Sequence, residues 1–233
     1  MLDPTGPDAS RTEPQQPQQA VRGHSRRARN SVKRRLIVAI TGASGVIYGT
    51  RALELLRTVP DLETHLIISP SAMRTIVQET TFSVDEVRGL ADHHYNYKDV
   101  GAAISSGSFR TDGMLVAPCS VKTLSGIAHC FDDELIVRAA DVCLKERRRV
   151  VLLFRETPLH AGHIALLEQA TRNGAIVMPP VPGFYTRPNS VADIVTQTVG
   201  RALDLFGIDT RIVKRWKETE ERCGWDRIVG KGP

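Results

Sequence analysis

Short apolar runs alternate with longer stretches of helical periodicity along residues 35–206. Apolar runs predict strands at 35–40 (RLIVAI), 64–69 (THLIIS), 113–120 (GMLVAPCS), 149–154 (RVVLLF) and 175–180 (AIVMPP). Apolar residues at helical spacing predict helices over 46–57, 70–80, 120–128, 133–147, 160–173 and 190–206. The strands are apolar on both faces, which indicates a sheet covered on both sides. The pattern therefore predicts an α/β fold with a mainly parallel sheet.

This pattern is absent from residues 1–34, which are rich in Pro, Gln and Arg and almost free of aliphatic side chains. Such a segment buries too little apolar surface to offset its ordering entropy, so we expect a disordered basic tail. It has no apolar core of a secretory signal, and its prolines and early acids disfavour an amphipathic presequence helix. We expect a folded domain over 35–217 and a C-terminal extension over 218–233.

The net charge of +5 belongs to the tail. Residues 1–35 contain eight Lys/Arg and three Asp/Glu, which leaves 23 of each in the remainder and a net charge of zero there. The folded part therefore has no basic surplus for nucleic acid. No apolar run approaches the roughly 20 residues that span a bilayer. We expect a cytoplasmic protein that binds neither nucleic acid nor membrane.

Cysteine and histidine residues give little sign of a metal site. The four cysteines form no C-x-x-C pair and have no histidine at metal-binding spacing, which favours free thiols in a reducing compartment over zinc. Cys119 follows a predicted strand, where a small buried side chain is the simpler interpretation. The segment HHYNY (93–97) is compatible with a metal or stacking site, but we interpret it as a surface loop. His160 and His163 are assigned to a helix start.

Polar residues directly follow the predicted strands. In a parallel sheet, ligands bind beyond the carboxyl ends of the strands, where the strand order reverses. The residues at these ends are Gly42, Ala43, Ser44, Ser69, Ser120, Lys122, Thr123, Arg155 and Glu156, with Tyr185 after the fifth strand. Hydroxyl groups, helix N-termini and an arginine at one edge favour a phosphate ligand.

The loop TGASG (41–45) does not by itself identify that ligand. It differs from the dinucleotide fingerprint G-x-G-x-x-G, no acidic residue ends the second strand, and the Walker lysine is missing. On its own it indicates a tight strand-to-helix turn in which Ser44 either caps the helix or contacts a ligand.

Longer motifs are more specific. They are TGASGVIYG, APCSVKTLSGIA, RAADVCLKERRRVVLLFRETPLH and PPVPGFYTRP. In this order and spacing, over about residues 35–217, they resemble the UbiX/Pad flavin prenyltransferase family. SGSFRTDGM and RETPLHAGHI are most similar to members encoded with hydroxyaryl-acid decarboxylases. The resemblance implies a flavodoxin-like or Rossmann-like three-layer sandwich. It also implies metal-independent prenylation of reduced FMN at N5 and C6 by dimethylallyl phosphate.

The resemblance also implies partners and residue roles. A UbiD-type decarboxylase would receive the prenylated FMN, and the chain would form homo-oligomers, commonly dodecamers. The FMN-binding residues would be Gly42, Ala43, Ser44, Ser69, Ser120, Val121, Lys122, Thr123 and Arg155, with Ser44 near the reacting edge. The residues near dimethylallyl phosphate would be Lys145, Glu156, Tyr185, Arg201, Arg138 and Trp216, partly across subunit contacts.

These residue types suit the implied chemistry. Breaking an allylic C–O bond builds negative charge on the phosphate, which Lys145, Arg201 and the Tyr185 hydroxyl would stabilise. Glu156 would act as general acid or base, and we take Ser44, Glu156 and Lys145 as the catalytic residues.

Structural roles remain open for the same side chains. Lys145 lies at a charged helix end, Arg201 on an amphipathic helix, and Tyr185 in a loop where its ring can pack. Glu156 can cap the next turn or pair with Arg155.

Two rival functions remain. A flavin-dependent cysteine decarboxylase would carry a P-A-S-A-N-T-like segment where this chain has APCSVKT. A non-catalytic FMN-binding subunit would not need the set Lys145, Glu156, Tyr185 and Arg201, which is intact here.

Overall fold

The computed structural model describes residues 33–216, and the predicted tail up to residue 32 and the extension 218–233 lie outside the described residues. In chain order the elements are β1 (Arg34–Ile40), α1 (Ile47–Leu56), β2 (Leu62–Ile68), α2 (Pro70–Glu79), α3 (Val84–Arg88), β3 (His93–Tyr95), η1 (Ala103–Ser105), β4 (Gly113–Cys119), α4 (Val121–His129), α5 (Leu135–Lys145), β5 (Arg149–Phe154), α6 (Ala161–Arg172), β6 (Ile176–Val177), η2 (Phe184–Thr186) and α7 (Val191–Asp204). Among these residues, no helix is long and apolar enough to cross a membrane.

The sheet has six strands in the order β3-β2-β1-β4-β5-β6. Every neighbouring pair is parallel, which confirms the predicted α/β class. The chain builds outward from β1 to β3 and then returns to add β4 on the other side of β1. The strand order therefore reverses between β1 and β4, which is where doubly wound sheets open a crevice for ligands.

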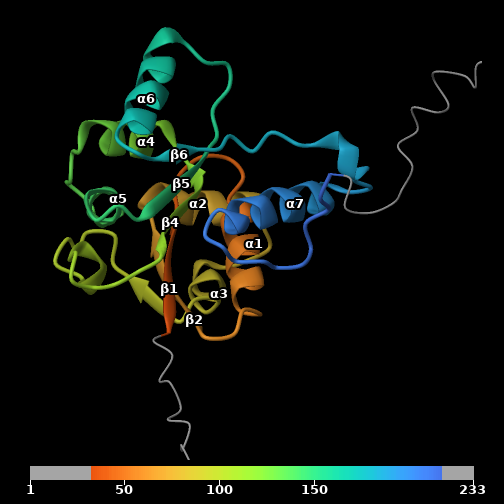
Figure 1. Cartoon of the computed structure of the whole chain (residues 1–233), viewed down its shortest axis with the longest axis horizontal. Helices are drawn as coiled ribbons and strands as arrows, with labels where there is room; N and C mark the ends of the chain where they lie inside the picture. The colour runs from red at the N-terminus through yellow and green to blue at the C-terminus, as the bar shows by residue number, and fades with distance from the viewer. Residues whose placement is uncertain (1–32, 217–233) are drawn as a thin grey trace, which may run out of the picture. The chain divides into compact units, whose positions relative to one another are not determined.

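Helices cover both faces of the sheet (Figure 1). Alternate β1 side chains supply the two cores: Leu36, Val38 and Ile40 pack in a cluster with residues of α1 and α7, and Ile37 and Ala39 pack with residues of α4 and α5. Figure 1 shows α4, α5 and α6 on one side of the sheet and α1 and α7 on the other. This confirms the predicted three-layer arrangement.

The segment between α2 and β4 differs most from the prediction. The segment His93–Tyr95 forms the edge strand β3, so the surface-loop interpretation of HHYNY is wrong for its first three residues. A strand this short and polar produces no apolar alternation. The helix α3 was also missed, although Ser83 and Glu86 form a capping box at its start. At the other edge, β6 contains only Ile176 and Val177 of the predicted strand.

The central strand β4 carries a proline near its end. Pro118 has no N–H to donate to a neighbouring strand, and the register between β4 and β5 shifts between Val116 and Cys119. The pairing of β1 with β4 ends at Ala39 and Val116. The two central strands thus separate just before the residues that were predicted to hold a ligand.

We predict that Gly49→Ala destabilises the fold because α1 lies against the sheet at this residue. A Cβ on Gly49 would lie 2.3 Å from the Ala117 carbonyl oxygen and 2.7 Å from Ile40 Cγ1. We expect a loss of ~1–3 kcal/mol in the free energy of unfolding, despite the higher helix propensity of alanine. Urea titration measures it. In the control Gly101→Ala, the nearest atom is Asp99 Oδ1 at 3.5 Å, so equal losses in the two variants would contradict the close packing.

Candidate functional site

A cavity of about 480 Å³ opens at the carboxyl ends of β1, β2, β4 and β5. Its wall contains every residue predicted to bind FMN, together with Glu156. The lining residues are Gly42, Ala43, Ser44, Ser69, Pro70, Ser71, Tyr97, Ser120, Val121, Lys122, Thr123, Glu134, Arg155 and Glu156. The volume lies within the range of small-molecule sites, and the position is the crevice between β1 and β4.

Two helices begin at this cavity with serine caps. Ser69 Oγ accepts a hydrogen bond from the Ala72 N–H at 3.2 Å at the start of α2, and Ser120 Oγ accepts one from the Thr123 N–H at 3.4 Å at the start of α4. The caps aim both helix N-termini, with their remaining free N–H groups, at one space. Such termini attract anions, so this part of the wall suits a phosphate.

Thr41 joins the loops on the two sides of the crevice. Its hydroxyl donates to the Pro118 carbonyl oxygen at 2.7 Å and accepts from the Ser120 N–H at 2.8 Å. Thr41 is completely buried, so water cannot replace either partner. The Thr41 N–H also donates to the Pro118 carbonyl oxygen at 3.3 Å, so the backbone and the side chain of this one residue together connect β1 and β4 beyond their last ladder pair.

The loop after β1 is shaped by glycine and by a distant carboxylate. A Cβ on Gly42 would lie 2.2 Å from Ser71 Cβ, and Gly45 has a φ of +98°, so both positions require glycine. The N–H groups of Gly45 and Val46 donate to Glu79 Oε2 at 2.7 and 3.3 Å. Ser44 does not cap α1, so that interpretation is wrong, and its side chain is exposed at the cavity.

Lys122 and Glu134 place opposite charges on the wall. Lys122 Nζ lies 3.6 Å from Glu134 Oε2 and donates to the Tyr97 hydroxyl at 3.3 Å. Burial raises the pKa of Glu134, and the Lys122 ammonium partly offsets this. Tyr97 and Glu134 were not predicted to line the site, because Tyr97 follows β3, a strand without an apolar pattern, and Glu134 precedes a helix.

Arg155 and Glu156 enter the cavity from the end of β5. Glu156 Oε1 accepts a hydrogen bond from the next N–H, that of Thr157, at 2.9 Å, which matches the turn-capping alternative. In the described part of the chain, these two residues form no ion pair with each other. Arg155 and Glu156 thus both line the cavity without being paired with each other.

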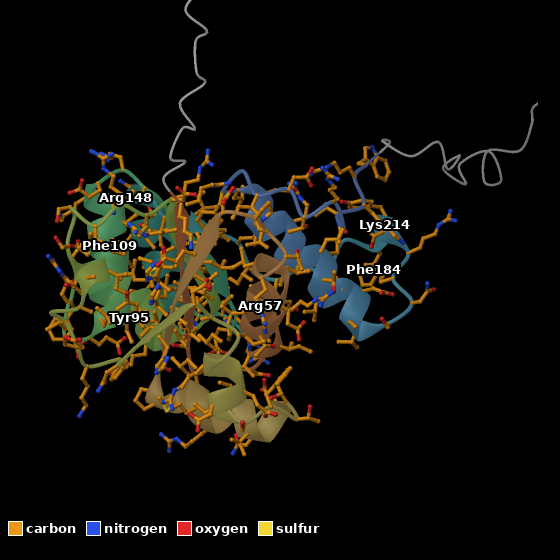
Figure 2. The ribbon with its side chains drawn as sticks, turned by 90° about the horizontal axis from the view of Figure 1, so that it is seen from below. Arg57, Tyr95, Phe109, Arg148, Phe184 and Lys214 are labelled. Carbon is orange, nitrogen blue, oxygen red and sulfur yellow. The ribbon has the colours of Figure 1, made fainter. Side chains whose placement is uncertain are left out.

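The other predicted site residues do not line this cavity. Lys145 pairs with Glu146 at 2.8 Å, and Arg201 with Asp204 at 2.6 Å. Arg138 pairs with Asp132 at 3.1 Å and with Asp141 at 3.4 Å. The Tyr185 ring packs edge-on against the Trp216 ring, with centroids 5.4 Å apart, near Phe184 and Lys214, which Figure 2 shows at one end of the molecule.

The positions of Lys145 and Arg201 follow from the topology. Lys145 is the last residue of α5, just before β5 begins at Arg149. Arg34 is the first residue of β1, and its guanidinium donates to the Phe206 carbonyl oxygen at 2.8 Å. Because Phe206 lies just after α7, this bond holds the end of α7 at the start of β1. Both cations therefore lie near the amino ends of the strands. A strand of six or seven residues spans about 20 Å, so neither cation reaches the cavity of its own chain.

Comparisons with known proteins agree with this geometry. The family model described as Flavoprotein matches residues 24–202. The flavin prenyltransferase UbiX of Escherichia coli K12 is 58% identical over 175 residues, which cover 75% of this chain and 93% of that protein.

Solved structures are similar as well. That of AnUbiX (PadA1), in complex with FMN and dimethylallyl pyrophosphate, is 50% identical, has a TM-score of 0.78 and covers 81% of this chain and 100% of that one. A dodecameric FMN-dependent UbiX-like decarboxylase from Escherichia coli O157:H7 is 48% identical, has a TM-score of 0.77 and covers 78% of this chain and 99% of that one.

We predict that Thr41→Val lowers the free energy of unfolding by ~1–3 kcal/mol, because it leaves the Ser120 N–H without its partner and the Pro118 carbonyl with only the backbone N–H of residue 41. Thr41→Ser keeps the hydroxyl and serves as the control. Denaturant titration measures stability, and hydrogen exchange of the Ser120 amide reports the local bond. Unchanged exchange in the valine variant would show that Thr41 does not hold the two loops together.

Proposed function

The chain belongs to the UbiX family of flavin prenyltransferases, and from this premise we propose that it transfers the dimethylallyl group of dimethylallyl phosphate to reduced FMN. The prenyl group joins N5 and C6 of the flavin. The observation that carries the proposal is the cavity between β1 and β4, because it gathers the residues that match the family's FMN-binding motifs.

The cavity fits FMN at both ends of that molecule. The N-termini of α2 and α4, with the Lys122 ammonium, offer N–H donors and positive charge to the FMN phosphate. The tight loop 42–44 lines the cavity, where it would let the flavin ring approach the backbone with the Ser44 hydroxyl near the ring's edge. Arg155 supplies a further cation from the end of β5.

The transfer step needs groups that accept charge and protons. As the allylic C–O bond breaks, positive charge develops on the prenyl carbon and negative charge on the phosphate. Lys145, Arg201 and the Tyr185 hydroxyl stabilise the departing phosphate. The Glu156 carboxylate moves a proton to the phosphate or from the flavin, as its position on the cavity wall allows.

A second copy of the chain completes the site. Lys145 and Arg201 lie near the amino ends of the strands, whereas the cavity lies at the carboxyl ends. Tyr185 and Trp216 are exposed on a separate part of the surface. Neighbouring subunits bring these residues, and Arg138, to the donor end. We propose a homo-oligomer, in accord with the dodecameric UbiX-like structure from Escherichia coli O157:H7.

The product leaves for another enzyme. Prenylated FMN serves a UbiD-type decarboxylase acting on aromatic acids, and the reaction takes place in the cytoplasm, in keeping with the free thiols of Cys119 and Cys143.

The two rival activities are disfavoured by the residues of the proposed site. The segment Ser120–Thr123 reads SVKT, unlike the motif of cysteine decarboxylases, and simple FMN carriage leaves the donor-binding residues without a use.

We predict that Glu156→Gln reduces prenylation at least ~100-fold while FMN remains bound, because the amide cannot exchange a proton. FMN fluorescence quenching measures binding, and chromatography of the released flavin measures turnover. Glu168→Gln, which changes an exposed carboxylate paired with Arg172, should prenylate normally. Normal turnover of the Glu156 variant would remove this residue from the mechanism.

We predict that two inactive variants rescue each other when mixed as subunits. Lys145→Ala and Glu156→Gln are each inactive alone. If one site takes Glu156 from one subunit and Lys145 from another, about a quarter of the sites in a random 1:1 oligomer contain both native residues. Co-expression with two affinity tags yields the mixed oligomer. Activity no higher than that of either variant alone would contradict a shared site.

A further inference from the structure

A cluster of three metal-binding side chains lies away from the cavity, on β2 and the edge strand β3. Glu63 and His65 are two residues apart on β2, so they point to the same face of the sheet. His93 is the register partner of His65 in the parallel pair of β2 and β3. Tyr95 and Phe109 flank this face, and Figure 2 shows both on the same side of the molecule.

The three side chains converge on one point. Their ligand atoms, two imidazole nitrogens and a carboxylate oxygen, all lie within 4.8 Å of one another. Glu63 Oε1 is 2.5 Å from His93 Nε2 and 3.8 Å from His65 Nε2. The two imidazole rings are stacked, with centroids 4.9 Å apart, so both present Nε2 to the same carboxylate oxygen.

His65 is the most informative member. Its side chain is 2% exposed, and its Nε2 has no hydrogen-bond partner. Its other nitrogen, Nδ1, is 2.9 Å from the Tyr95 hydroxyl. Metal-binding histidines commonly have one nitrogen held by such a partner and the other aimed at the ion. A buried imidazole nitrogen without a partner is thus directed at the Glu63 carboxylate.

Charged neighbours fix the carboxylate and balance the site. The Arg35 guanidinium donates to the other Glu63 oxygen, Oε2, at 3.2 Å and lies over the Phe109 ring, 4.6 Å from its centroid. Oε1 therefore faces the imidazoles. The Asp92 carboxylate, which accepts from the Thr64 N–H and hydroxyl at 2.8 Å, adds negative charge nearby and opposes the charge of Arg35.

We propose that Glu63, His65 and His93 bind a divalent transition-metal ion of the Zn²⁺ type. Two imidazoles and one carboxylate are a zinc-binding set, and the half-exposed His93 leaves the fourth position to water. The ion joins the three-residue edge strand β3 to β2 and so stabilises the edge of the sheet. His65 is four residues before Ser69 on the cavity wall, about 13 Å along an extended strand, so the site takes no part in prenyl transfer.

The test uses full-length protein stripped with EDTA and titrated with Zn²⁺ by calorimetry, and with Co²⁺ by visible absorption. We expect one ion per chain and a rise in Tm with Zn²⁺. His93→Asn should weaken binding by ~tenfold or more and abolish the rise in Tm. The matched control is His94→Asn, because His94 is adjacent in β3 but its side chain points to the opposite face.

Glu63→Gln provides a second loss-of-ligand variant whose bond to Arg35 can persist through its amide oxygen. The proposal is overturned if native protein binds neither ion at micromolar concentration. It is also overturned if His93→Asn binds as well as the native chain, which would assign the ion to other histidines such as His160 and His163. Equal losses in the His93 and His94 variants would overturn it as well.

Discussion

The buried hydroxyl of Thr41 is the contact on which the functional part of this fold depends. A parallel sheet that reverses its strand order opens a crevice at the reversal, and its two sides then need a connection beyond the last ladder pair. Thr41 provides that connection: its N–H and its hydroxyl both donate to the Pro118 carbonyl, and the hydroxyl accepts from the Ser120 N–H. The glycine loop on one side and the start of α4 on the other are thereby held at a spacing that leaves a cavity.

The sequence predicted the buried strands, because each is a continuous run of apolar residues. The apolar runs of β1, β4 and β5 predicted buried strands, and the positions after those strands predicted that Gly42, Ser120 and Arg155 lie close together, as they do on the cavity wall. Local pattern failed where tertiary contacts decide the structure. The polar strand β3 exists because it pairs with β2, and Tyr97 and Glu134 reach the cavity through connections that no periodicity reveals.

The division of labour within the chain follows from its topology. The loops proposed to bind the flavin follow the carboxyl ends of the strands, and Lys145 and Arg201 lie near the amino ends. In the mechanism proposed above, a single subunit carries both halves of the donor site but cannot bring them together, so activity depends on assembly. The cluster of Glu63, His65 and His93 lies on a third part of the surface, at the edge strand β3. Its proposed role is to stabilise that edge of the sheet, and it takes no part in prenyl transfer.

The most direct test of this account is anaerobic incubation of the protein with reduced FMN and dimethylallyl phosphate, followed by mass spectrometry of the released flavin. The account predicts a flavin heavier by one C5H8 unit, formed without added metal. Bound but unmodified FMN, under conditions in which a known flavin prenyltransferase is active, would contradict it and leave the chain as a flavin carrier. Dimethylallyl pyrophosphate, tested in parallel, identifies which donor the phosphate-binding residues accept.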